Sequence, residues 1–276
     1  MRKQIGQHLK TLVHKLLFLF SWPCFHAFYD ILRVFALAGM GIGTGDRIES
    51  SGEILALRRM RYALIHHYAA QQWVVFDVGA NQGDFTAAAI TALGSRASIY
   101  AFEPSQTTYD YLIKCNFINA KLYNFGFSNK HESLMLHSIP ENSGLASLYA
   151  RKLDHFSYQP AQSSLVQLKT MDDFCRENHI SRIHILKMDI EGHEFSALQG
   201  AKNLLSSQCI NFIQFEFGGC NIDSRRFFQD FYYLLCPLYD IYRILPHGML
   251  KIKKYSERDE VFVTTNYLAV LKNMSF

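Results

Sequence analysis

The sequence predicts a doubly wound α/β fold, and three observations lead to this prediction. Short apolar segments alternate with amphipathic ones over residues 53–217, a glycine-rich turn follows the first apolar segment, and single acidic residues follow three later ones. Strands and helices that alternate at this spacing imply right-handed crossovers and a parallel sheet. We therefore expect helices on both faces of a mainly parallel sheet.

Each element is predicted from its hydrophobic pattern. Apolar residues from Ile54 to Tyr68 recur at intervals of three and four, which is typical of an amphipathic helix over residues 53–70. Further helices are expected at residues 84–93, 109–117, 172–178 and 194–205. Strands are expected at residues 73–78, 98–102, 122–127, 183–188, 210–217, 239–245 and 266–271.

Residues 130–170 interrupt the alternation. They are polar and rich in Gly and Ser, with alternating apolar positions at 133–137 and 164–168. This pattern predicts an inserted hairpin or a lid over the site. Its aromatic residues Tyr149, Phe156 and Tyr158 suit stacking on a sugar, although core packing explains them equally well.

Length and composition indicate one main domain with an appendage. The chain has 276 residues, of which 49% are hydrophobic and 19% charged, so it can bury a proper core. We expect residues 51–276 to form the main domain. Residues 1–50 are expected to form a basic and apolar helical extension that ends in a glycine-rich linker.

The net charge of +4 belongs to the N-terminus, because Arg2, Lys3, Lys10 and Lys15 precede the first acidic residue, Asp30. The remaining 24 basic and 24 acidic residues cancel. A phosphate backbone is held by clustered cations, so we expect no nucleic-acid partner for the main domain.

The N-terminal extension allows three interpretations. Its basic residues lead into an apolar run at 16–20, but Pro23 and Asp30 soon interrupt it, and a spanning helix needs about twenty apolar residues. An accessory helix is the first expectation. A helix in peripheral contact with an anionic membrane through residues 1–35, and a signal or anchor, are the alternatives.

Four alternating glycines follow the extension, at positions 39 to 45, and indicate a linker. A phosphate-binding loop is disfavoured because no Lys-Ser or Lys-Thr pair follows. The six cysteines of the chain are scattered without a C-x-x-C pair or a zinc spacing, which is typical of reduced thiols. We therefore expect a cytoplasmic catalytic body with possible membrane association through its N-terminus.

The first candidate site is the turn after the first strand, Asp77-Val78-Gly79-Ala80-Asn81-Gln82-Gly83. Gly79 and Gly83 allow a sharp turn and a close approach of the backbone to a ligand. Doubly wound sheets bind nucleotides at this place. Because Asn81 stands where a dinucleotide fingerprint has its second glycine, a cofactor without phosphate is favoured over a dinucleotide.

The second candidate is Glu103, which ends the second strand about twenty residues after the glycine turn. A carboxylate at this place accepts hydrogen bonds from ribose hydroxyls. An exposed acid that caps a helix is the structural alternative.

The third candidate is the run Lys187-Met188-Asp189-Ile190-Glu191-Gly192-His193-Glu194 after the fourth strand. Asp189 is placed to bind an ammonium group, while Glu191 and His193 are candidates for a general base. His193 is equally explained as a residue that caps the following helix. Glu216 ends the fifth strand beside the same crevice, and a pair between Lys187 and Glu216 is possible.

The same acidic residues raise the possibility of a divalent metal, which would polarise a diol substrate. Gly218-Gly219 stands after the fifth strand where an Asp-Asn pair would supply ligands. We therefore expect no metal.

Taken in order, the glycine turn, Ala101-Phe102-Glu103-Pro104, the 187–194 run and Asn266-Tyr267 resemble the FkbM family of methyltransferases over residues 51–271. The resemblance implies a class I methyltransferase (Rossmann-like) fold, with a seven-stranded sheet whose last strand is antiparallel. It implies S-adenosyl-L-methionine as cofactor and O-methylation of a hydroxyl on a sugar or secondary metabolite, so the acceptor would be a small molecule or a glycan.

Carried over by position, the resemblance places the cofactor along Gly79, Asn81 and Gly83, its ribose at Glu103 and its methionine end at Asp189. Ser128, after the third strand, is assigned to the adenine neighbourhood. Two rival functions stay open at this point. One is a nicotinamide-dependent oxidoreductase, and the other is a non-catalytic cofactor-binding protein docked at a membrane.

Overall fold

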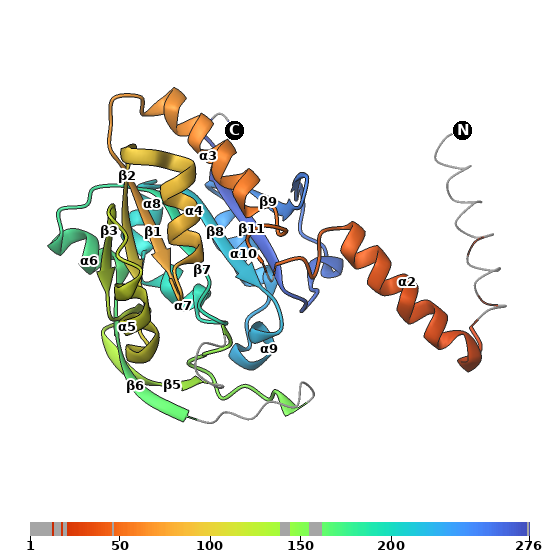
Figure 1. Ribbon diagram of the computed structural model, residues 1–276. Coiled ribbons are helices and arrows are strands. Elements are labelled where there is room, and N and C mark those ends of the chain that lie inside the picture. The colour runs from red at the N-terminus through yellow and green to blue at the C-terminus, as the bar shows by residue number, and fades with distance from the viewer. Residues whose placement is uncertain are drawn as a thin grey trace. The chain divides into compact units, whose positions relative to one another are not determined.

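An eight-stranded sheet lies at the centre of the computed structural model, which describes residues 13, 18, 21–45, 47–138, 144–154, 162–274 and 276 (Figure 1). In spatial order its strands are β10 (Gly248–Lys251), β9 (Tyr239–Leu245), β11 (Thr265–Leu271), β8 (Ile210–Phe217), β7 (Ile183–Met188), β1 (Trp73–Val78), β2 (Ala97–Phe102) and β3 (Ala120–Tyr123).

The central strands pair in parallel. Strands β3, β2, β1, β7 and β8 run in one direction, whereas β11 is antiparallel to both of its neighbours, β8 and β9. All eight residues of β8 are buried, as expected for a parallel strand that is covered on both faces. The prediction of a parallel sheet with an antiparallel last strand is confirmed, and β10 adds an eighth strand at the edge.

Helices cover both faces of this sheet. They are α3 (Glu53–His67), α4 (Asp84–Leu93), α5 (Gln106–Lys114), α6 (Met171–Glu177), α7 (Glu194–Gln199), α8 (Lys202–Ser206), α9 (Cys220–Ser224) and α10 (Phe228–Leu235). Figure 1 shows α3 and α4 in front of the sheet and α8 and α10 behind it. Aromatic rings fill the core between the layers, where Phe102 contacts Phe76, Phe127 and Phe174.

A second, three-stranded sheet contains the inserted segment. Strand β5 (Glu132–Ser138) forms an antiparallel pair with β6 (Gln162–Lys169), and β4 (Gly126–Phe127) pairs with β6 in parallel. The insertion at 130–170 therefore contains a hairpin, which was one of the two structures predicted for it. Phe156 and Tyr158 lie outside the described residues.

Two predicted elements are wrong in detail. The strand expected at 122–127 is divided between β3 and β4, because the chain leaves the main sheet at Asn124, whose side-chain amide bonds the carbonyl oxygens of Glu103 and Pro104. The helix expected at 194–205 breaks at Gly200 into α7 and α8. The Asp172 carboxylate accepts the backbone N–H groups at the start of α8, which makes a new helix start there.

The chain divides into two compact units, Met1–Met40 and Gly41–Phe276. The boundary thus falls ten residues before the predicted one, because the glycine-rich segment packs with the larger unit. Ile42 is buried, and Gly43 donates a hydrogen bond to the carbonyl oxygen of Thr264. The smaller unit contains a 3₁₀ turn at Pro23–Phe25 and helix α2 (His26–Gly39). Among the described residues, no helix combines the length and the apolar character that a bilayer crossing demands.

Candidate active site

A cavity of about 500 Å³ lies at the carboxyl ends of the parallel strands. Loops after β1, β2, β7 and β8 line it, together with residues of the inserted segment and of the chain before α3. This is the place where open α/β sheets bind their ligands. Arg47 and Lys187 are the cationic residues that line the cavity, and the acidic lining residues outnumber them. The acidic residues are Glu49, Glu53, Asp84, Glu103, Asp189, Glu191 and Glu216. The excess of acidic groups favours a ligand that donates hydrogen bonds or carries positive charge.

The turn after β1 is as sharp as predicted, but its glycines leave space for neighbouring protein atoms and not for the backbone's approach to a ligand. Gly79 has a φ of +79°, and a Cβ there would lie 1.9 Å from the carbonyl oxygen of Asp189. Gly83 has a φ of +91°, and its Cβ would meet the ring of Phe117 at 2.7 Å. Both glycines thus make room for other parts of the protein. Gly79 and Asn81 line the cavity, whereas Gly83 does not contact it.

Glu103 faces the cavity from the end of β2, beside the glycine turn. Its Oε2 accepts the backbone N–H of Asn81 at 3.0 Å, and its Oε1 accepts that of Ser105 at 2.8 Å. These two bonds fix the carboxyl group, and each oxygen keeps a further lone pair. Burial raises the pKa of Glu103 to about 7, although both hydrogen bonds oppose the shift.

Asp77 does not line the cavity, contrary to its predicted place. It is fully buried, accepts the hydroxyl of Thr86 at 2.6 Å, and lies 3.4 Å from the ammonium of Lys187. Lys187 also donates to the carbonyl oxygen of Gly79 at 3.3 Å and lies 3.5 Å from Asp189. Burial opposes the charge on Lys187, but Asp77 and Asp189 outweigh it and raise the pKa of the ammonium. Lys187 therefore joins the β1 and β7 loops through these acids, and the pair with Glu216 that we considered is absent among the described residues.

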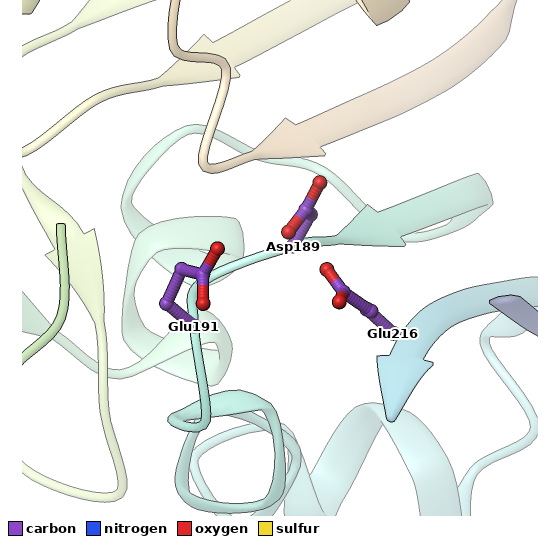
Figure 2. Close-up of side chains that lie close together, drawn as sticks. All are labelled: Asp189, Glu191 and Glu216. Carbon is purple, nitrogen blue, oxygen red and sulfur yellow. The ribbon is translucent and has the colours of Figure 1, made fainter. Parts of the chain in front are cut away.

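Three carboxyl groups, here named the carboxylate triad, converge beside Lys187: Asp189, Glu191 and Glu216 (Figure 2). One oxygen from each lies within 4.8 Å of the others. Asp189 and Glu191 come from the end of β7 and the loop behind it, and Glu216 from the end of β8. This spacing is compatible with a divalent cation as well as with shared protons.

The members of the triad differ in their affinity for protons. Against the effect of burial, Lys187 and a hydrogen bond from Glu216 hold the pKa of Asp189 below its ordinary value. Burial, Asp189 and Glu191 raise the pKa of Glu216 well above its ordinary value. Burial and Asp189 raise the pKa of Glu191 to about 8, against the attraction of Arg151. Near neutral pH the triad therefore keeps Asp189 ionised and Glu216 protonated, whereas the ionised fraction of Glu191 grows as the pH rises toward 8.

Glu191 is held between the β7 loop and the inserted segment. Its backbone is left-handed, with a φ of +51°, its carboxylate pairs with Arg151 at 2.5 Å, and its carbonyl oxygen accepts the hydroxyl of Ser147 at 2.7 Å. A left-handed non-glycine residue is costly and persists only where neighbours enforce it. The Glu194 carboxylate supplies part of this support by accepting the backbone N–H groups of Ile190 and Gly192.

His193 lines the cavity, but both of its ring nitrogens have partners. The Ser128 hydroxyl donates to Glu132 at 2.8 Å, so its oxygen accepts Nε2–H of His193 at 3.0 Å. Nδ1 then accepts the hydroxyl of Tyr149 at 3.0 Å. Burial lowers the pKa of His193 to about 4, so the imidazole is neutral. Ser128 is fully buried in this chain of bonds and does not line the cavity.

Glu53 and Arg151 were missed as site residues in the sequence, and Tyr149, which was considered for sugar stacking, bonds His193 instead. Glu53 lines the cavity from the start of α3, where its carboxylate accepts the hydroxyl of Ser51 and the amide of Gln214. The run Ser51-Gly52-Glu53 ahead of this helix was the signal in the sequence that could have identified Glu53. Arg151 and Tyr149 lie about forty residues before their partners, Glu191 and His193, and no local pattern connects them.

The strand order, the antiparallel last strand and the acid at the end of β2 define a class I methyltransferase fold. Residues 77–236 match the family model described as the methyltransferase FkbM domain, which is more than half of the chain. The chain therefore belongs to this family. Its domain is an S-adenosylmethionine-dependent methyltransferase domain, and this result disfavours the nicotinamide alternative and the non-catalytic one.

Known proteins resemble the chain at low identity. The hexuronic acid methyltransferase AglP of Haloferax volcanii is 27% identical over 174 residues, which cover 60% of this chain and 66% of that protein, just under two thirds. A crystal structure of a methyltransferase FkbM from Methylobacillus flagellatus KT is 16% identical, over 87% of this chain and 60% of that one, with a TM-score of 0.42. The plantazolicin methyltransferase BpumL in complex with SAH is 12% identical, over 82% and 86% of the two chains, with a TM-score of 0.42.

Proposed function

We propose that the protein transfers a methyl group from S-adenosylmethionine to a hydroxyl of a small acceptor, a sugar or a secondary metabolite. The carboxylate triad carries this proposal, because it places proton acceptors beside the cofactor cavity, at the edge where β7 and β8 end. Transfer from a sulfonium needs an aligned acceptor oxygen and a group that accepts the acceptor's proton.

The cavity residues fit the cofactor. The volume of about 500 Å³ lies within the range of sites for ligands of this size. Glu103 presents two fixed oxygens to the cavity, which suits the two ribose hydroxyls. Asp189 is ionised, and its side chain is 42% exposed, which suits the methionine ammonium. When bound, the cofactor supplies the activated methyl group.

Glu191 is the proposed general base. Its carboxylate lines the cavity, and its raised pKa of about 8 makes it a stronger proton acceptor than an ordinary carboxylate. The ion pair with Arg151 orients it and supports its ionised form. As the acceptor oxygen gains the methyl group, its proton passes to a Glu191 oxygen. Glu216 donates its proton to Asp189, and in this way it keeps Asp189 ionised beside Glu191.

His193 is assigned a positioning role, in place of the base role that we first considered. A lowered pKa of about 4 makes it a weak base, and both nitrogens are engaged. Through Tyr149 and Ser128 it connects the inserted segment to the β7 loop. This connection keeps the wall of the cavity next to Glu191 in place.

A sugar is the acceptor class that we favour. The hexuronic acid methyltransferase is a relative of this chain, and the carboxylate oxygens of the cavity can accept hydrogen bonds from the several hydroxyls of a sugar. The inserted segment, which lines the cavity through Leu145 and Leu148, would select among acceptors.

Thermal unfolding in the presence of separate ligands tests the cofactor. S-adenosylmethionine is expected to raise the midpoint of unfolding, because it binds only the native state, and NAD is expected to leave the midpoint unchanged. A shift with NAD and none with S-adenosylmethionine would overturn the proposal. A Glu177→Gln variant, altered at an exposed residue of α6, serves as the control for unspecific charge effects.

A further inference from the structure

Helix α2 in the smaller unit has one polar and one apolar side. His26, Tyr29, Asp30 and Arg33 recur at the spacing of one helix face, and Asp30 lies 3.3 Å from both the His26 imidazole and the Arg33 guanidinium. The large apolar residues recur at the same spacing on the rest of the helix. They are Phe28, Ile31, Leu32, Val34 and Phe35.

Within the smaller unit, no described residue covers the apolar side of α2. Phe35 is 74% exposed, and none of the fourteen helix residues is buried. Trp22, just before the helix, is exposed as well. A contiguous exposed apolar face of this kind marks an interaction surface, because water alone does not stabilise it.

The charge of the chain is concentrated in the same unit. Residues 1–45 contain five Lys or Arg side chains and one Asp, and the remaining 23 basic and 23 acidic side chains cancel. The whole net charge of +4 therefore belongs to the segment that contains α2. Two copies of this segment would repel each other, whereas an anionic surface would attract it.

We propose that α2 lies flat on an anionic lipid surface, with its apolar side among the acyl chains and its polar stripe toward water. Aromatic and branched apolar residues on one side, together with nearby cations, are the features of interfacial helices. A flat orientation follows because the polar stripe and the apolar side both run along the length of α2. This inference does not depend on the proposed methyl transfer.

Co-sedimentation of the full chain with vesicles tests the proposal. We expect binding to phosphatidylcholine vesicles that contain about one third phosphatidylglycerol, and little binding to pure phosphatidylcholine. The double variant Ile31→Asp/Phe35→Asp is expected to lose more than about tenfold in affinity, because two apolar side chains no longer enter the lipid. The matched control Tyr62→Asp/Ile118→Asp adds the same charge at exposed apolar residues of the larger unit and is expected to bind more tightly than the helix variant.

Three results would overturn the inference. The wild-type chain could fail to bind the anionic vesicles, the helix variant could bind as well as the control, or binding could be equal with both lipid compositions. Gel filtration tests whether a second copy of the chain, and not a lipid surface, covers the apolar side of α2. This would be the result if the wild type forms a dimer and does not bind vesicles, and if the helix variant is a monomer. Equal unfolding midpoints of the two double variants show that both are folded.

Discussion

Replacement of Glu103 by Gln tests the assignment of the ribose site. The variant keeps the size of the side chain but exchanges one oxygen for an amide NH₂ group. That group cannot accept a backbone N–H from Asn81 or Ser105, nor a ribose hydroxyl. Loss of a charge-assisted hydrogen bond costs about 2 to 3 kcal/mol, which is about a 30- to 150-fold increase in the dissociation constant of S-adenosylmethionine.

The pH dependence of the dissociation constant of S-adenosylmethionine gives a second, independent test of the role of Glu103. Because the pKa of Glu103 is raised to about 7, the unliganded protein must release a proton before the carboxylate binds the ribose. Affinity should therefore rise with pH, and binding at pH 6 should be about tenfold weaker than at pH 8. The Gln variant should lack this contribution.

Isothermal titration of both proteins with S-adenosylmethionine at the two pH values measures these effects. Glu177→Gln, on the surface of α6, is the control for the removal of a carboxylate. An unchanged dissociation constant in the Glu103 variant would refute the ribose assignment. An identical pH dependence in both proteins would refute the role of this carboxyl group in the proton linkage.

Four further predictions follow from the site. Glu191→Gln should lower turnover by about 10²- to 10⁴-fold with cofactor affinity intact, and should abolish a rise of the wild-type rate toward pH 8; an unchanged rate excludes it as base. Tyr149→Phe should lower the free energy of unfolding by about 1 to 2 kcal/mol, since a buried imidazole nitrogen loses its donor, and an unchanged denaturation midpoint would contradict the bond. Gly79→Ala should cost more than about 3 kcal/mol by calorimetry, because its Cβ would meet the Asp189 carbonyl oxygen; a stable variant would refute that contact. Turnover in EDTA should equal turnover with Mg²⁺, and activation by Mg²⁺ would show that the carboxylate triad acts through a cation.

The hydrophobic pattern was sufficient for most of the main sheet, because the parallel strands β1, β2, β7 and β8 are almost entirely buried and are bounded by polar turns. It was insufficient where a distant side chain determines the structure. Nothing near residue 200 indicates that Asp172 begins a new helix there. Likewise, the apolar run at 122–127 gives no sign that Asn124 turns the chain toward a second sheet.

The candidate site was predictable as far as strand ends determine it. Glu103, Asp189 and Glu216 follow parallel strands, so topology alone brings them to one cavity. The roles of neighbouring residues depend on burial and on partners from the inserted segment. Asp77 pairs with Lys187, and burial lowers the pKa of His193 so that its imidazole is neutral. The local sequence reveals neither of these two facts.

Transfer of a labelled methyl group is the most direct test of the central claim. The full chain is incubated with methyl-labelled S-adenosylmethionine and a mixture of glycans and small hydroxylated metabolites, with Glu191→Gln as the comparison, and the labelled product is treated with alkali. The proposal predicts that wild-type protein gives a labelled methyl ether that alkali does not cleave, and that the variant gives far less. Absence of transfer, or label released as methanol from an ester, would contradict methylation of a hydroxyl.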